Sequence, residues 1–560
     1  MRIPVGRPER RTGPGQSATP ERRTAWARRW ADRSRELLTS PRRRGVAAVA
    51  AGALPALAFP EPSLWWFAYV ALVPWMLLVR SAPTGRRAAV EGWLGGIGFV
   101  LAVHHWLVPS LHVFIVVLAA LLGLMWAPWG WLVRRLLGGV PSPGRSAAAI
   151  AVVPSAWLMI ELTRSWEALG GPWGLLGASQ WEVSPALRLA SVGGVWLVSL
   201  LVLAVNTAVT VLAAVPRSRT PAVGGILVCA LTTSAAWLWA PQPRAAGGTT
   251  IAVVQPGVVG GADSVDRRFD VSEQLTRELA GQDLDLVVWG ESSVGADLRE
   301  RPDLAARLAV LSRQVGAELL VNVDARRVDP DGQAGIYKSS VLVGPQGPTG
   351  DRYDKMRLVP FGEYIPARSL LGWATSVGKA AGEDRLRGAG PVVMTLPGEG
   401  RGGLRVGPLV CFESAFPDMS RRLVRDGAQL LIAQSATSSF QGSWAPEQHA
   451  SLAALRAAES GRPMAHATLT GVSAVYGPGG ERIGAPLSTD TVGAAVYDVP
   501  LAEGSTLYVR FGDWPVYGAL AVLAALCAAG GLRLLRPPAA PEPGAPPART
   551  ARESAARPVR

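Results

Sequence analysis

The chain has 560 residues, of which 49% are apolar and only 18% are charged, and its net charge is +14. In an ordinary soluble protein about a quarter of the residues are charged, so the composition excludes that class and favours a membrane protein. The positive charge does not indicate nucleic-acid binding, because it is concentrated at the two ends, with thirteen arginines in the first 44 residues. Basic segments next to apolar ones are typical of cytoplasmic membrane flanks.

Residues 1–44 are predicted to be a disordered, Arg-rich cytoplasmic extension, since no apolar stretch of signal-peptide type precedes Gly45. Seven apolar segments follow, each close to the length at which a helix crosses a bilayer. They lie at 45–60, 63–80, 91–108, 112–133, 146–163, 192–214 and 222–240 and form a predicted membrane domain over residues 45–240. An eighth span is predicted within 511–536, and the Pro-rich residues 537–560 are predicted to be a disordered cytoplasmic tail.

The arginines of the connecting loops predict the orientation of the eight spans. The loops after the second, fourth and sixth spans contain Arg80, Arg86, Arg87, Arg134, Arg135, Arg145, Arg217 and Arg219. The short loops at 60–63 and 109–111, on the other side, contain no basic residue. Positive charge marks the cytoplasmic side. Both termini are therefore expected in the cytoplasm, and segment 241–510 is expected on the extracytoplasmic side.

Segment 241–510 has a different pattern from the spans. Short β-rich stretches alternate with helical ones, which is typical of a layered α/β domain. The predicted strands are 250–256, 284–290, 318–325, 339–345, 404–412, 428–435, 463–471 and 493–500, and the predicted helices include 271–281, 303–315 and 447–460. The stretch 344–350, rich in Gly and Pro, predicts a hairpin turn between two strands.

Three residues at or near the ends of predicted strands can carry chemistry: Glu291, Lys355 and Cys411. A cysteine attacks as a thiolate, a glutamate can take the thiol proton, and a lysine can stabilise the thiolate and an oxyanion. Taken singly, each residue has a simpler interpretation. Glu291 can be a helix-capping carboxylate, Lys355 a surface charge and Cys411 a buried thiol. A disulfide is not expected, because the other two cysteines, Cys229 and Cys527, lie in predicted spans.

The chain has no cluster of His and Cys with the spacing of a metal site, so neither a metal nor another cofactor is expected. His104 and His105, in the third predicted span, are either a polar membrane site or interfacial residues. Glu161 and Arg164 lie three residues apart on one face of the fifth predicted span. They are either a contact for a lipid headgroup or docking partner, or an ion pair that satisfies itself.

The order Glu–Lys–Cys and the sequence around each residue resemble the nitrilase superfamily. The flanks "VVWGES" (287–292), "DKMRLVPFGEYIP" (354–366) and "VCFES" (410–414) are similar to those of bacterial apolipoprotein N-acyltransferases. "RAAESGRPMAHATLTGVSAVYGPGG" (456–480), and "ELTRSW" (161–166) and "GGPWGLLG" (170–177) in the membrane part, also resemble that family. The resemblance covers about residues 45–535.

This resemblance implies a bundle of eight membrane spans with a nitrilase-like αββα sandwich between the seventh and eighth, in the bacterial cytoplasmic membrane. It implies an enzyme that moves a fatty acyl chain from a membrane phospholipid to the α-amino group of the N-terminal diacylglyceryl-cysteine of an apolipoprotein. In that mechanism Glu291 is the general base, Lys355 stabilises the oxyanion, and Cys411 forms a thioester. Nucleic acid is not expected as a partner.

Three further residues carry over from the family as support for the site or substrate binding: Glu363, Glu413 and Phe412. The chain also departs from the family pattern. Phe412 stands where Tyr is frequent, and His466 stands where Arg is common. Segment 436–444, "ATSSFQGSW", lacks an Asn and an Asp that many members have, which concerns substrate positioning more than the Glu–Lys–Cys set.

Two alternative functions stay open on the sequence. The first is a membrane-tethered nitrilase-like amidase that hydrolyses a small amide or nitrile through the same three residues. Eight spans argue against it, because a soluble substrate needs no access to the bilayer. The second is a weakened paralogue that binds lipoproteins without catalysis, which the altered segment 436–444 favours and the intact Glu–Lys–Cys set opposes.

Overall fold

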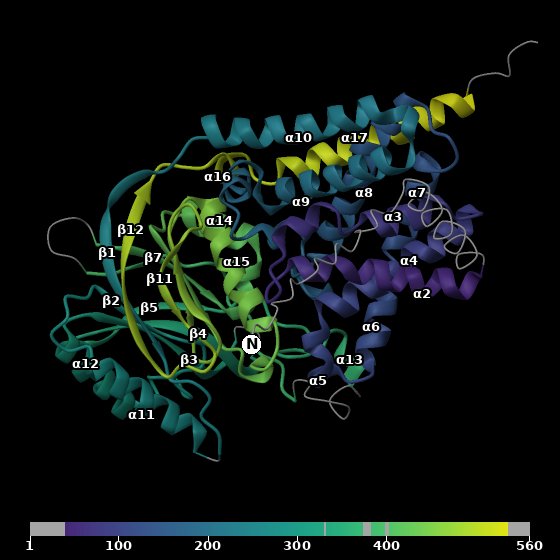
Figure 1. The fold of residues 1–560 in the computed structure, drawn as a ribbon. Helices are drawn as coiled ribbons and strands as arrows, with labels where there is room; N and C mark the ends of the chain where they lie inside the picture. The colour runs from purple at the N-terminus through teal and green to yellow at the C-terminus, as the bar shows by residue number, and fades with distance from the viewer. Residues whose placement is uncertain (1–39, 262, 330–331, 373–381, 398–402, 536–560) are drawn as a thin grey trace, which may run out of the picture.

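The computed structural model describes residues 40–535 except 262, 330–331, 373–381 and 398–402. The predicted C-terminal tail and residues 1–39 of the predicted N-terminal extension lie outside the described residues. Figure 1 shows two parts side by side, a bundle of helices and a domain with two β-sheets. The chain passes from the bundle into the sheet domain at β1 and returns to the bundle with its last helix, α17.

The helices of the bundle overlap the apolar segments predicted as spans, but their bounds differ from the predicted ones. They are α2 (Pro41–Ala53), α3 (Val73–Arg80), α4 (Gly85–Val103), α5 (Val108–Leu111), α6 (Phe114–Gly123), α7 (Trp126–Leu137), α8 (Pro143–Arg164), α9 (Ser184–Ala214), α10 (Arg219–Trp239) and α17 (Trp514–Leu535). Within the described chain, α8, α9 and α10 are long and apolar enough to cross a membrane singly. The number is five if α4–α5 and α6–α7, which bend by 67° and 42°, each form one span.

Helix α2 begins at Pro41, so residues 41–44 are helical and do not belong to the predicted disordered extension. The reason is Arg44, which is only 6% exposed and whose Nε lies 2.6 Å from Oε1 of Glu91, a buried residue of α4. A carboxylate buried among helices requires a paired cation. This pairing holds the first turn of α2 in the bundle, and the charge pattern of the sequence did not reveal it.

Glycines allow the helices of the bundle to approach closely. A Cβ atom added at Gly52 in α2 would lie 2.0 Å from the carbonyl oxygen of Gly95 in α4. In contrast, nothing lies within 4 Å of a Cβ atom added at Gly224 in α10. Small residues at such contacts are typical of membrane helices, because they let two backbones come together.

Replacing Gly52 by Ala is therefore expected to lower the midpoint of thermal unfolding of the detergent-solubilised protein, because α2 and α4 must move apart. Overpacking of this kind costs about 1–3 kcal/mol. The matched control is Gly224→Ala, which is expected to leave the midpoint unchanged or slightly raised because Ala favours the helix. Equal effects of the two substitutions would contradict the close contact of α2 with α4.

The second part contains two six-stranded sheets. In the first sheet the strand order is β12-β1-β2-β3-β4-β5, formed by β1 (Arg244–Gln255), β2 (Leu286–Trp289), β3 (Glu318–Val328), β4 (Ala334–Gly344), β5 (Gly347–Asp354) and β12 (Gly493–Glu503). In the second sheet the order is β11-β10-β9-β8-β7-β6, formed by β6 (Met394–Thr395), β7 (Arg405–Val410), β8 (Leu430–Ser435), β9 (Met464–Thr468), β10 (Ser473–Tyr476) and β11 (Arg482–Leu487). Strands β1, β2 and β3 run parallel, as do β7, β8 and β9.

Helices cover the outer face of each sheet, which gives the predicted αββα arrangement. Helices α11 (Ser264–Arg277) and α12 (Pro302–Val315) pack on the first sheet through a core that includes Phe269 and Leu308. Helices α14 (Pro417–Arg425) and α15 (Ala445–Ser460) cover the second sheet. In Figure 1, α15 lies between the second sheet and the bundle. The sheet domain is therefore joined to the membrane part through α15.

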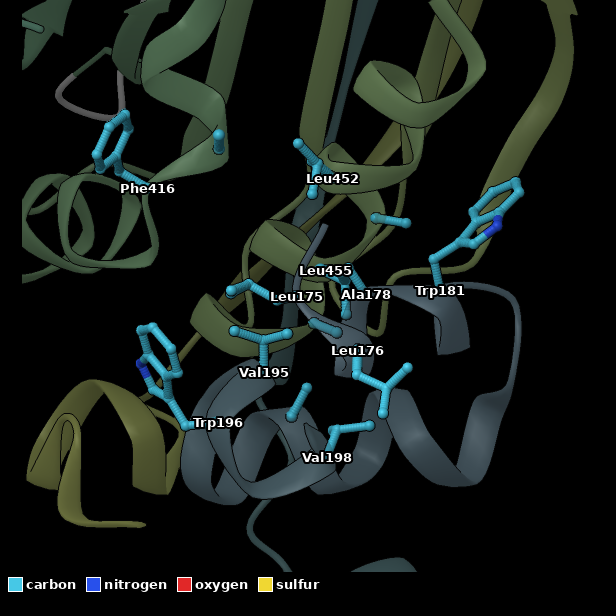
Figure 2. Close-up of a cluster of buried hydrophobic side chains, with 14 of the residues drawn as sticks. Leu175, Leu176, Ala178, Trp181, Val195, Trp196, Val198, Phe416, Leu452 and Leu455 are labelled. Atoms are coloured by element: carbon cyan, nitrogen blue, oxygen red, sulfur yellow. The ribbon is translucent and has the colours of Figure 1, made fainter. Parts of the chain in front are cut away.

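The contact between α15 and the bundle is apolar around a break in α9. Figure 2 shows Leu452 and Leu455 of α15 facing Leu175 and Val195. Helix α9 leaves the helical conformation just before Val195, and the freed Val195 N–H donates to Oε1 of Glu459 at 2.7 Å. A side chain of α15 thus caps the second half of α9, which fixes the position of the sheet domain on the bundle.

All eight predicted strands are present, as β1, β2, β3, β4, β7, β8, β9 and β12, and a hairpin joins β4 to β5, which begins at Gly347 inside the predicted turn 344–350. The three predicted helices correspond to α11, α12 and α15. The sequence pattern misses β6, β10 and β11, of which β10 has only four residues. Strand β6 has only two residues, and β11 is an edge strand with no buried residue, so neither shows the apolar alternation of a half-buried strand.

Candidate active site

The structure brings Glu291, Lys355 and Cys411 together where strands of both sheets end. Glu291 follows β2 and Lys355 follows β5 in the first sheet, and Cys411 follows β7 in the second. Carboxyl ends of parallel strands, such as β2 and β7, are the usual place for a site in an α/β fold. The site therefore lies between the two sheets.

Close backbone contact holds the two sheets together at this point. The Glu291 N–H donates to the Ser435 carbonyl oxygen of β8 at 3.1 Å. A Cβ atom added at Gly290 would lie 2.0 Å from the backbone nitrogen of Leu469, so only glycine fits before Glu291. Between the sheets, Gln434 donates from Nε2 to the carbonyl oxygen of Trp289 at 2.8 Å. These contacts fix the position of the Glu291 backbone against the second sheet.

The Lys355 ammonium lies between two carboxylates. Its Nζ is 2.8 Å from Oε1 of Glu363 and 3.2 Å from Oε1 of Glu291. All three side chains are buried, and Lys355 is only 1% exposed. Cys411 is the one partly exposed residue of the group, and its charged neighbours are enclosed.

These charges decide the resting protonation of the site. Burial raises the pKa of Glu291, but the charges of Lys355 and Lys338 outweigh it and bring that pKa down to about 2. Burial lowers the pKa of Lys355, but the charges of Glu291 and Glu363 outweigh it and raise that pKa well above its usual range. Burial, and then the charge of Glu291, raise the pKa of the Cys411 thiol, against the opposing charge of Lys355.

The resting site therefore holds an ionised carboxylate, an ammonium and a neutral thiol. Glu291 is close enough to the Cys411 thiol to accept a hydrogen bond from it. The backbone N–H of Ala436 also faces the Cys411 sulfur, and with Lys355 it offers donors for negative charge. This arrangement can remove the thiol proton during nucleophilic attack and can stabilise an oxyanion.

Two residues of the site have left-handed backbone conformations. Cys411 has φ +52° and Ser292, directly after Glu291, has φ +56°. Side chains other than glycine rarely adopt this region, which costs about 1–3 kcal/mol per residue, and such strain is concentrated at functional sites. The left-handed conformation turns the chain sharply after β2 and after β7.

Comparisons with known proteins show the family to which the chain belongs. The sequence-family model for the apolipoprotein N-acyltransferase N-terminal domain matches residues 51–208, and the family model for carbon-nitrogen hydrolases matches residues 250–507. An apolipoprotein N-acyltransferase from Geobacter metallireducens is 30% identical over 87% of this chain and 95% of the relative. The chain belongs to the apolipoprotein N-acyltransferase family. As a member of this family it is an acyltransferase of lipoprotein biosynthesis, and its sheet domain is a nitrilase-like domain.

Other similar proteins cover the chain to different extents. An apolipoprotein N-acyltransferase from Azotobacter vinelandii is 33% identical over 85% of this chain and 93% of the relative. Among solved structures, an amidase of the nitrilase superfamily from Nesterenkonia AN1 is 22% identical, with a TM-score of 0.34. It covers 49% of this chain and 98% of the amidase chain.

The family resemblance predicts that Glu363 and Glu413 support the site, and these two carboxylates occupy different positions. Glu363 contacts Lys355 directly and accepts from the Val359 N–H through Oε2 at 2.8 Å. Glu413 is fully buried, and its Oε1 accepts from the N–H groups of Met356 and Arg357 at 2.7 and 3.0 Å. Its Oε2 accepts from the Val410 N–H at 2.7 Å. Glu413 thus ties the end of β7 to the segment that contains Lys355.

Replacing Glu413 by Ala is expected to lower the midpoint of thermal unfolding clearly, because it leaves three backbone N–H groups without an acceptor. Each buried group left unsatisfied costs about 1–3 kcal/mol. The matched control is Glu481→Ala on an exposed loop between β10 and β11, which is expected to change the midpoint little. A midpoint for Glu413→Ala equal to that of the control would contradict this anchoring role.

Phe412 packs away from the charged group. Its ring is buried and lies edge-on to Phe416 at a centroid distance of 4.9 Å. A Cβ atom added at Gly171 of the membrane part would lie 2.6 Å from the Phe412 ring, so the bundle contacts the turn after β7 here. The apolar ring keeps this contact without the hydroxyl that many family members have.

Segment 436–444, which departs from the family pattern, lies against the membrane part. Phe440 is 5.0 Å from Trp106 and Trp444 is 4.4 Å from His105, between ring centroids and edge-on. Ala436 reaches the Cys411 sulfur through its backbone N–H, which does not depend on the side chain. The loss of the Asn and the Asp therefore leaves the contacts of the Glu–Lys–Cys set in place.

Sequence reasoning missed two residues that contact this group. His449 of α15 places Nε2 3.0 Å from the Cys411 carbonyl oxygen and 3.0 Å from Oγ of Ser414, and its ring is edge-on to His466. Lys338 of β4 places Nζ 3.6 Å from Oε1 of Glu291. An isolated His or Lys gives no signal in one sequence, because only the fold brings either of them to the site.

Glu161 and Arg164 of α8 are buried but do not pair with each other among the described ion pairs, so the predicted ion pair is absent. Oε1 of Glu161 accepts from the Leu176 N–H at 2.7 Å, and Arg164 donates to the Trp173 carbonyl oxygen. Each keeps one polar atom without a hydrogen-bond partner in the described chain. A lipid or docking contact at these residues stays a prediction.

Proposed function

We propose that this acyltransferase moves a fatty acyl chain from a membrane phospholipid to the α-amino group of the N-terminal diacylglyceryl-cysteine of a lipoprotein. The observation that carries the proposal is the buried ammonium of Lys355, held between Glu291 and Glu363 beside the partly exposed residue Cys411. The family supplies the lipoprotein acceptor. The phospholipid donor and the residue roles are our inference.

In the first half-reaction the Glu291 carboxylate takes the proton of the Cys411 thiol as the sulfur attacks the ester carbonyl carbon of the phospholipid. A carbon–sulfur bond forms, and the carbonyl electron pair moves to oxygen. Lys355 and the Ala436 N–H face the Cys411 sulfur and can stabilise this oxyanion. The ester C–O bond then breaks, and the lysophospholipid oxygen leaves with the proton from Glu291.

In the second half-reaction the amino group of the lipoprotein attacks the thioester carbon. Glu291, ionised again, takes a proton from the amine, and Lys355 stabilises a second oxyanion. The carbon–sulfur bond breaks, the amide forms, and the Cys411 sulfur regains a proton from Glu291. The two substrates thus react in turn through one covalent intermediate, which is ping-pong catalysis.

Contacts between the site and the bundle support a donor that comes from the bilayer. The Leu358 N–H, three residues after Lys355, donates to Oε1 of Glu167 at 3.1 Å. Trp173 donates from Nε1 to Oε1 of Gln448 in α15 at 2.8 Å. The membrane segment 167–174 therefore lies against the ends of the catalytic strands, where a lipid ester would have to enter.

We further propose eight spans, formed by residues 45–240 and 511–536, with residues 241–510 on the extracytoplasmic side and both termini in the cytoplasm. Beyond the five spans of the longer helices, α2 with its following turn, the helical segment Trp65–Arg80, and α17 supply three more. Arginines at one end of the bundle support the orientation. The Nε atoms of Arg80 and Arg145 donate to carbonyl oxygens at the end of α7, both at 3.0 Å.

The proposal is tested with the full-length protein and vesicles whose phospholipid has an isotope-labelled acyl chain. Without acceptor, one labelled acyl chain is expected on the protein, and peptide mapping is expected to place it on Cys411. It should be released by hydroxylamine, which cleaves thioesters. A diacylated lipopeptide added next should receive the label as an amide on its amino group, at the expense of the labelled protein.

Other outcomes separate the competing functions. Ammonia release from a small amide such as butyramide, without labelling of the protein, would support an amidase and overturn the proposal. Binding of the lipopeptide without either labelling or hydrolysis would support a non-catalytic paralogue. Label on the lipopeptide without a protein-bound intermediate would overturn the thioester mechanism.

A further inference from the structure

A second lysine contacts the carboxylate that we propose as the base. Lys338 lies in β4, with Nζ 3.6 Å from Oε1 of Glu291 and 3.2 Å from Oδ1 of Asp324. It also donates to the hydroxyl of Ser292, the residue with left-handed backbone directly after Glu291. The Lys338 side chain is only 13% exposed, so solvent screens its charge weakly.

The fold fixes Lys338 in this position from both sides. Asp324 and Lys338 are directly opposite each other in the antiparallel pair β3–β4. On the other side, the Lys355 N–H donates to the Lys338 carbonyl oxygen at 2.9 Å. The two lysines therefore come from neighbouring strands and approach the same oxygen, Oε1, of Glu291.

We propose that Lys338 is a positioning residue that acts through Glu291. It holds the carboxylate ionised and oriented in both half-reactions, and it lowers the pH at which the Cys411 thiolate can form. Asp324 limits this effect by pairing with the same ammonium. The proposal rests on the roles proposed above for Glu291 and Cys411.

The charges around Glu291 show why one lysine does not suffice. The charged and titratable groups that face it come from several elements: Lys338 in β4, Asp324 in β3 behind it, Lys355 and Glu363 after β5, Cys411 after β7 and His449 in α15. Lys355 is nearer to Glu363 than to Glu291. Without Lys338, one buried ammonium would serve two carboxylates, and Glu291 would compete for it.

The same charge acts after proton transfer. When Glu291 has taken the thiol proton, the negative charge lies on the Cys411 sulfur beside the ammonium of Lys355, and Lys338 still adds positive charge at the Glu291 end of the group. Removing the Lys338 charge thus raises the apparent pKa of the thiol. Removing the Asp324 charge frees the Lys338 ammonium from its partner and moves the apparent pKa in the opposite direction.

The experiment measures how fast iodoacetamide alkylates Cys411 at each pH from 5 to 10. It uses the full-length protein in detergent, and peptide mass spectrometry follows the Cys411 peptide. For Lys338→Met the profile is expected to shift to higher pH, with alkylation at pH 8 about tenfold slower, which corresponds to one pKa unit. Lys338→Arg, which keeps the charge, is expected to stay within about threefold of wild type, and Asp324→Asn is expected to shift the profile to lower pH.

Thermal midpoints of all variants are measured in parallel. Superimposable profiles for wild type and a folded Lys338→Met protein would overturn the proposal. So would a shift of Lys338→Met and Asp324→Asn in the same direction, because a purely structural network responds alike to the loss of either partner. If Lys338→Met does not fold, the Asp324→Asn profile tests the proposal: a shift to lower pH supports it, and a shift to higher pH or no shift overturns it. No lipid is present, so the result is independent of whether a phospholipid is the donor.

Discussion

The variant Cys411→Ala is expected to form no acyl-enzyme and to transfer no acyl chain to a lipopeptide. The structure offers no second thiol in reach, since Cys229 lies buried in α10 and Cys527 lies in α17. Loss of a covalent nucleophile typically lowers the rate by about 10⁴-fold or more. The measurement is mass spectrometry of lipoprotein N-termini in cells that depend on this enzyme, together with the vesicle assay on the purified variant.

Two controls make the loss interpretable. Cys229→Ala removes a thiol of similar size from the bundle and is expected to leave transfer unchanged. The thermal midpoint of Cys411→Ala is expected to stay close to that of wild type, because the substitution removes one neutral side-chain atom and leaves the buried charges paired. Transfer by Cys411→Ala at a rate comparable to wild type would show that the sulfur is not the nucleophile.

The sequence predicted this thiol because several weak signals coincided. Cys411 alone is an ordinary strand-end cysteine, and Glu291 and Lys355 alone are ordinary charged residues. Each, however, follows an apolar strand directly or within two residues, and strands of α/β domains end at a common edge. The order and the flanking residues then pointed to one family, which the relatives with similar length and sequence now show.

The parts that the sequence did not reveal depend on contacts between distant segments. Arg44 pairs with Glu91 across 47 residues, and Lys338 reaches Glu291 across 47 residues as well. Neither residue stands in an unusual local pattern, so composition assigned Arg44 to a disordered extension. Long-range pairing of this kind follows from topology, and a single sequence gives no register between strands or helices.

Helix irregularities form the second group that sequence pattern did not predict. Hydropathy finds apolar stretches that overlap the helices, but it gives no sign that α9 begins at Ser184 and breaks at Gly193 and Gly194, or that α4 bends before α5. In α9 the break is stabilised by Glu459 from a domain 264 residues later in the chain. Average apolarity over a window is the same for a straight helix and a broken one, so the break is not readable from it.

The variant Lys355→Met is expected to lose most acyl transfer, although less completely than Cys411→Ala, and, unlike it, to be less stable. The ammonium is 2.8 Å from Glu363 and 3.2 Å from Glu291, and all three groups are buried. Breaking a buried ion pair by removing one partner costs about 3–5 kcal/mol. The loss of the oxyanion donor alone lowers the rate by about 10²–10³-fold.

The pH dependence of stability gives this prediction a sign. The pKa of Glu291 is lowered from 4.5 to about 2, so its ionisation stabilises the folded state fully above about pH 4.5, and this contribution is lost as the pH falls toward about 2. Without Lys355 the pKa of Glu291 rises, because burial then acts against a weaker positive charge. The decline of the thermal midpoint with falling pH is therefore expected to begin at a higher pH in Lys355→Met than in wild type.

A double variant separates stability from catalysis. Lys355→Met combined with Glu363→Gln removes one positive and one negative charge, so the buried group keeps the same net charge as wild type. The midpoint is expected to recover most of the loss seen in Lys355→Met, whereas the rates of thioester formation and of transfer are expected to stay low. Recovery of the transfer rate together with the midpoint would show that Lys355 acts only by holding the fold, and its role at the oxyanion would have to be abandoned.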